Sequence, residues 1–104
     1  MKYLVFTLSM PHAASWNGRW SGEGRKYVRA RSFTEEQFKK LPDIANKDFG
    51  YRWDDGWVAC VRVELVDSAK EKNKLVKGSV GFYGYDWMIK SILQHGKILR
   101  GSST

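Results

Sequence analysis

The sequence is poor in the residues that build disulfide frameworks and metal centres. It contains one cysteine, Cys60, and two histidines, His12 and His95. A single cysteine cannot form an internal disulfide, so nothing favours a secreted, disulfide-stabilised protein. No Cys/His spacing typical of zinc sites occurs, and we predict neither a metal nor a cofactor. A Cys60–histidine catalytic dyad is not favoured either, because a cysteine in mid-strand usually serves as a small buried hydrophobe.

Long hydrophobic runs are also missing. The apolar run nearest the start covers residues 3–8 and is soon interrupted by Ser9 and Pro11. It is too short to span a membrane, and no small-residue cleavage site of a signal peptide follows it. We therefore expect a cytoplasmic protein without a membrane partner.

What the chain does contain is enough apolar area for one core. It has 104 residues, of which 42% are hydrophobic, with five Trp, five Tyr and five Phe. This length supports one compact domain and hardly a second. We predict a single α+β domain over residues 1–99, followed by a frayed tail over 100–104.

Strand-like segments occupy much of the chain. Residues 2–10 have apolar side chains on both alternating faces, which is typical of a central strand. Residues 25–33 alternate cleanly and predict a second strand. Residues 51–53 and 57–66 predict two more, joined by a hairpin turn at Asp54-Asp55-Gly56, while 43–50 resembles a loop.

Helix signals stand between and after these strands. Thr34 and Gln37 form a capping box, and Pro42 ends the helix that they begin. A lysine-rich, solvated helix is predicted to run to about Lys77, with Ser68 as its N-cap and Glu71 at N3. An amphipathic helix that packs on the sheet follows, with Asp86 in or near its first turn and His95-Gly96 as its C-terminal stop. Its apolar residues at helical spacing are Phe82, Tyr85, Met88, Ile89, Ile92 and Leu93. Together the segments indicate a small, mainly antiparallel sheet of about three to five strands with two or three helices.

The formal charge of +7 is unevenly distributed. Residues 1–33 carry six basic side chains against one acidic, residues 34–66 are slightly acidic, and residues 67–104 are basic again. Such asymmetry suggests a positive surface for nucleic acid or an acidic protein. A net charge of this size is also ordinary for the solubility of a small domain.

The strand over residues 25–33 is the strongest candidate for that surface. Its alternation predicts a modest core face at Lys26, Val28, Ala30 and Ser32, and a basic-aromatic outer face. In a complex with nucleic acid, the arginines of that outer face would contact phosphates and its aromatic rings would stack on bases. The alternative is that Tyr27 and Phe33 are buried under a helix, with the arginines at the rim. The proposed nucleic-acid-binding residues are Arg19, Arg25, Lys26, Tyr27, Arg29 and Arg31.

Three segments of the chain have distinctive amino-acid sequences: SMPHAASWNGRWSGEGRKYVRAR, WDDGWVACVRVELVD and GFYGYDWMIKSI. In these segments the chain resembles a family of small uncharacterised proteins from bacterial and phage-type mobile genomes. The resemblance extends from Ser9 to about Ile98. It implies a bacterial or phage intracellular setting and carries over no catalytic residue.

Two other functions compete with non-catalytic nucleic-acid binding. The first is a protein–protein module of a mobile element, such as an inhibitor of a host defence or regulatory protein. Exposed Trp16, Trp20 or Trp87 would then serve as anchors of the interface. The second is a small hydrolase or nuclease, which requires Asp54, Asp55, Glu64 or a histidine to converge in one cleft.

Overall fold

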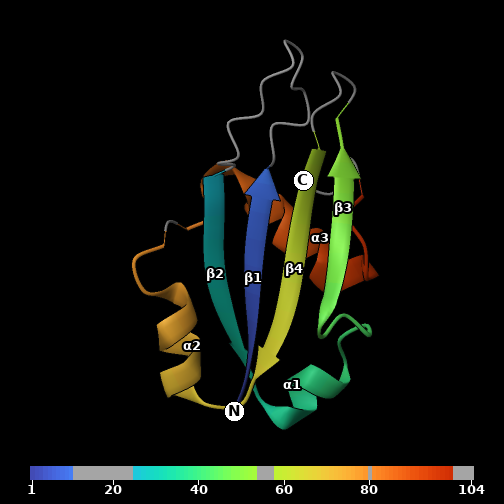
Figure 1. The fold of residues 1–104 in the computed structure, drawn as a ribbon. Coiled ribbons are helices and arrows are strands. Elements are labelled where there is room, and N and C mark those ends of the chain that lie inside the picture. The colour runs from blue at the N-terminus through green and yellow to red at the C-terminus, as the bar shows by residue number, and fades with distance from the viewer. Residues whose placement is uncertain (11–24, 54–57, 80, 100–104) are drawn as a thin grey trace.

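The architecture is one four-stranded antiparallel sheet with helices packed against it, as Figure 1 shows. The computed structural model describes residues 1–10, 25–53, 58–79 and 81–99, and within them it confirms the predicted α+β class. The strand order is β2-β1-β4-β3. The elements are β1 (Lys2–Met10), β2 (Arg25–Phe33), α1 (Glu35–Lys39), β3 (Lys47–Arg52), β4 (Val58–Val66), α2 (Ala69–Val76), the 3₁₀ turn η1 (Tyr83–Tyr85) and α3 (Asp86–His95).

Strand β1 lies in the interior of the sheet, as its apolar residues on both faces predicted. It pairs with β2 on one side and with β4 on the other, so that Leu8 lies opposite both Tyr27 and Val61. Phe6 and Val5 point to opposite faces, and both side chains are buried. A strand buried on both faces must be covered by helices on each side of the sheet.

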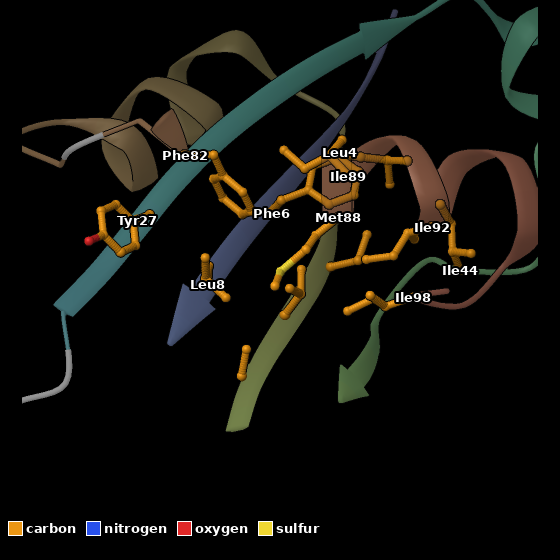
Figure 2. Close-up of a cluster of buried hydrophobic side chains, with 13 residues drawn as sticks. Leu4, Phe6, Leu8, Tyr27, Ile44, Phe82, Met88, Ile89, Ile92 and Ile98 are labelled. Atoms are coloured by element: carbon orange, nitrogen blue, oxygen red, sulfur yellow. The ribbon is translucent and has the colours of Figure 1, made fainter. Parts of the chain in front are cut away.

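The face that α3 covers, here called the core face, holds the main hydrophobic core (Figure 2). Alternate residues of the two interior strands meet the apolar stripe of α3. Phe82, just before η1, is fully buried in the same cluster. The fully buried members with large side chains include Leu4, Phe6, Leu8, Ile44, Val61, Val63, Phe82, Met88, Ile89 and Ile92.

The opposite face of the sheet, here called the outer face, carries α2. This helix contacts β1, β2 and β4, and the outer-face residues Val5 and Val66 are buried. The ammonium group of Lys72 lies 5.6 Å from the centroid of the Tyr3 ring. Cys60 and Arg62, farther along this face, are exposed.

The predicted facing of β2 is wrong. Direct partners of an antiparallel pair share a face, and the register places Tyr27 opposite Leu8 and Arg29 opposite Phe6. The basic-aromatic side of β2 therefore lies on the core face, where Tyr27 is buried. Alternation separates the two faces of a strand, but the register with β1 decides which one is covered.

Local signals at the helix ends are confirmed. The Thr34 hydroxyl accepts from the Gln37 amide (3.1 Å), and the Gln37 side chain accepts from the Thr34 amide (2.9 Å). Ser68 caps α2 by accepting from the Glu71 amide. Gly96 ends α3 with φ of 72°, a conformation that L side chains rarely adopt.

Strand β3 begins four residues before the predicted strand, so residues 47–50 are not a loop. The turn before it contains Asn46 at φ of 60°, and the Asn46 side-chain oxygen accepts from the Leu65 amide at 3.1 Å. This bond ties the turn to β4 and sets the start of the β3·β4 ladder. Lys, Asp and Gly are disfavoured in strands, which is why the sequence pattern missed the pairing.

Candidate nucleic-acid interface

Arg29 and Arg31 of β2 lie at the rim of the core face, as the alternative interpretation of this strand predicted. Arg29 donates to the carboxylate of Asp86, the first residue of α3, with 2.8 Å between Nη1 and Oδ1. Both side chains are close to half exposed. An ion pair of this kind contributes up to about 1 kcal/mol. It also neutralises much of the charge that Arg29 would offer to a phosphate.

The remaining predicted residues of this strand divide into three cases. Arg31 is exposed and has no ion pair within the described ranges of the chain. The buried ring of Tyr27 packs against Tyr85, with centroids 5.8 Å apart, and has no open face for a base. Arg19 lies outside the described residues, as do the side chains of Arg25 and Lys26.

The predicted protein-binding tryptophans are placed only in part. Trp87 is half-buried, and its ring meets Tyr51 edge-on, with centroids 5.2 Å apart. It belongs to a chain of ring contacts that continues through Trp53 to Tyr85, so Trp87 packs within the fold. Trp16 and Trp20 lie outside the described residues.

Among the described residues, the densest group of unpaired cations lies on α2 and its C-cap, Lys77. Lys70, Lys74 and Lys77 are exposed and have no ion pair in the part of the chain that the structure describes. Their spacing of four and three residues places them on one side of the helix. Lys72, by contrast, turns inward to Tyr3. We call Lys70, Lys74 and Lys77 the lysine stripe.

The lysine stripe borders a shallow, open groove of about 510 Å³. Besides the three lysines, Ser68, Asn73 and Glu71 line it. The groove thus combines three cations and two neutral hydrogen-bonding side chains with a single carboxylate. From Lys70 to Lys77 the helix rises about 10 Å, which matches about three nucleotide steps of 3.4 Å along one strand of a duplex.

Besides Arg29, three cations of the described chain are held by carboxylates. Lys2 lies 3.6 Å from both Glu35 and Asp67, and Lys47 lies 3.0 Å from Asp43. Arg62 contacts two acidic side chains of the outer face, Asp48 and Glu64. Lys39, Lys40, Arg52, Lys90 and Lys97 are exposed too and have no ion pair among the described residues. What distinguishes the lysine stripe is therefore that its three unpaired lysines share one side of a helix and line one groove. The sequence predicted a solvated helix here, and the spacing of its lysines is already present in the sequence.

Catalytic combinations considered from the sequence are not assembled in the described part. Cys60 lies on the outer face, whereas His95 ends the helix that covers the core face. Glu64 also lies on the outer face, where it contacts Arg62. Among the described residues no group of three or more His, Cys, Asp or Glu could hold a metal ion. His12, Asp54 and Asp55 lie outside them.

Cys60 is a free thiol on the outer face. Partial burial raises its pKa, the charge of Asp48 raises it further, and Arg62 lowers it. A raised pKa means less of the reactive thiolate at neutral pH.

We expect iodoacetamide to alkylate Cys60 at pH 7.4 more slowly than it alkylates free cysteine. Asp48→Asn removes a negative charge that raises the pKa, so this variant should react faster than the parent protein. Asp43→Asn, which removes an equal charge beside Lys47, is the control and should leave the rate unchanged. Mass spectrometry measures the rates, and equal rates for all three proteins would contradict the assignment.

Comparison with known proteins adds no relative to this picture. No family model, curated protein or solved structure matches the chain. No helix within the described ranges has the length and apolar character needed to cross a membrane.

Proposed function

We propose that the protein is a non-catalytic binding protein for an acidic partner, nucleic acid first, and that α2 supplies its main contact. The observation that carries the proposal is the lysine stripe, three exposed lysines that line one groove and are unpaired within the described residues. Phosphate contacts of this kind provide affinity without reading the base sequence. A cytoplasmic setting in bacteria or their phages, expected from the sequence, belongs to the same proposal.

The β2 edge extends the positive surface beyond α2. Helix α2 lies beside β2 at one edge of the sheet (Figure 1), and Arg31 is the exposed, unpaired arginine of that strand in the described chain. Arg31 sits on the core-face side of β2, and α2 packs from the outer face. A strand of nucleic acid lying along this edge contacts lysines first and Arg31 at its margin. In this proposal the arginines of β2 therefore contribute less to binding than the lysines of α2.

The test is a salt titration of binding to labelled single strands and duplexes of DNA and RNA. The variant Lys70→Gln/Lys74→Gln/Lys77→Gln removes three phosphate contacts. We expect it to lower the slope of log affinity against log salt by about 2 for single strands and about 3 for duplexes. Fluorescence anisotropy between about 50 and 200 mM salt measures both slopes.

A matched variant separates this site from net charge. Lys39→Gln/Lys40→Gln/Lys90→Gln removes three exposed lysines from α1, its C-cap and α3. It should keep the parent slope, whereas Arg31→Ala should lower it by less than one unit. If the parent protein does not bind nucleic acid at low salt, the proposed function is wrong. If both triple variants have the same slope of log affinity against log salt, the lysine stripe is not the binding site.

A further inference from the structure

Strand β3 forms an open edge of the sheet. It pairs with β4 on one side, and no described strand pairs with its other side, which lies at the margin of the molecule (Figure 1). The opposite edge, β2, contacts both α1 and α2. An open edge exposes a row of unpaired backbone N–H and C=O groups, which can pair with another strand.

The charges of β3 are complementary to those of a second copy of β3 that runs antiparallel to it. Asp48 and Arg52 both lie on the outer face, two residues to either side of Gly50. When a second copy of β3 runs antiparallel with Gly50 opposite Gly50, Asp48 of each copy lies opposite Arg52 of the other. The two-fold symmetry forms this opposite-charge pair twice. Such cross-strand pairs stabilise a sheet, and like charges in the same places oppose it.

Alternative registers lose these pairs. A shift by one residue would place the core face of one copy beside the outer face of the other, because side chains alternate along a strand. A shift by two residues would place Gly50 opposite Asp48 or Arg52 and leave no opposite charges facing each other. The register centred on Gly50 is thus favoured because it keeps the core faces of both copies on one side of the sheet and places opposite charges opposite each other.

The core-face side chains of β3 fit the same arrangement. Phe49 and Tyr51 lie opposite Val61 and Ala59 of β4, and both remain half-buried at the edge of the core. In the register centred on Gly50, Phe49 of one copy lies opposite Tyr51 of the other. The pairing would therefore cover apolar surface that the single chain leaves partly exposed.

Gly50 places no side chain on the outer face at the centre of this register. The nearest atom to a Cβ added at Gly50 would be the Ala59 carbonyl oxygen at 3.9 Å, an ordinary contact. Packing within the described chain therefore does not require glycine, although glycine weakens a strand interior. In the register centred on Gly50, the two glycines lie opposite each other and place no side chain between the two opposite-charge pairs.

We propose that β3 pairs antiparallel with β3 of a second copy of this chain, centred on Gly50. The result is a two-fold symmetric dimer with one continuous sheet. Each strand contributes only the residues Lys47–Arg52 to the ladder. The interface is small and belongs to the weak, transient class, so the dimer forms at high protein concentration.

Sedimentation equilibrium from about 10 to 500 µM, the range suited to a weak interface, tests the proposal. The parent protein should shift from 12.0 kDa towards twice that mass. Arg52→Asp places like charges opposite each other twice and should weaken dimerisation at least about tenfold. Arg31→Asp makes the same change in the other edge strand and should leave dimerisation unchanged.

A charge exchange makes the test specific to the register. Asp48→Arg alone should also be monomeric, but an equimolar mixture of D48R and R52D should form a heterodimer, because each Arg then faces an Asp. Circular dichroism confirms that each variant is folded. A monomeric parent protein, a mixture that stays monomeric, or equal disruption by R31D would overturn the proposal. None of these outcomes depends on nucleic-acid binding.

Discussion

Phe6→Ala is expected to lower the free energy of unfolding by about 3–5 kcal/mol. Phe6 is fully buried in β1 at the centre of the core face (Figure 2), where its ring fills space between the sheet and α3. Alanine removes most of that apolar contact and leaves a cavity that the two interior strands cannot close. Because domains of this size unfold with about 5–15 kcal/mol, the variant is close to the limit of folding.

Urea denaturation measures the change, and Phe38→Ala is the matched control. Phe38 is half-buried on α1 at the margin of the core. The same truncation there should cost about 1 kcal/mol, since less surface leaves water on folding. Equal losses for the two variants would contradict the placement of Phe6 at the centre of the core.

Ser91→Ala is expected to cost about 2 kcal/mol, although it removes one oxygen atom. Ser91 is fully buried on α3, its hydroxyl donates to the Lys97 carbonyl at 2.7 Å, and it accepts from the Leu99 amide at 2.8 Å. These two bonds hold the segment after α3 against the helix. Without the hydroxyl, the Lys97 carbonyl and the Leu99 amide in this part-buried region lose their hydrogen bonds to Ser91.

Hydrogen exchange of the Leu99 amide provides a local measure of the same change. It should be faster in the Ser91→Ala variant, and urea denaturation should show the global loss. Ser79→Ala is the control, because the exposed Ser79 hydroxyl donates to the Val76 carbonyl at 2.6 Å and its loss should cost less than about 0.5 kcal/mol. Unchanged exchange at Leu99 would show that the Ser91 hydroxyl does not hold this segment.

Short-range sequence signals predicted the helices well. The capping box at Thr34 and Gln37 and the cap at Ser68 depend on residues three apart, and both hydrogen-bond patterns are present. The left-handed conformation of Gly96 likewise marks the end of α3. Such signals are local, so no knowledge of the tertiary structure is needed to interpret them.

Long-range pairing explains the two errors. The alternation of residues 25–33 showed two faces, but only the register with β1 placed Tyr27 and Arg29 on the covered one. Residues 47–50 carry no strand pattern of their own and become a strand because β4 offers them a partner. Residues 47–50 pair with residues 60–63, and Tyr27 and Arg29 pair with Leu8 and Phe6. Both partners lie beyond the few neighbouring residues on which local propensity depends, so propensity could not supply them.

The candidate site was predictable in charge but not in location. The uneven distribution of charge along the sequence predicted a basic surface. The ion pair between Arg29 and Asp86 joins residues from opposite ends of the chain, and no spacing rule predicts it. The lysine stripe on α2, in contrast, follows a helical spacing that could have been recognised before the structure was known.

The position of β1 has a consequence for synthesis of the chain. β1 is made first, but its second neighbour β4 is completed only at Val66, which lies opposite Tyr3. At ribosomal rates of about 5–20 residues per second, the interval between completing β2 and completing β4 lasts roughly 2–7 s. During that interval a nascent β1–β2 hairpin exposes the edge of β1 that later pairs with β4. Another chain can pair with this open edge, so the interval is one in which a chaperone would protect the growing chain.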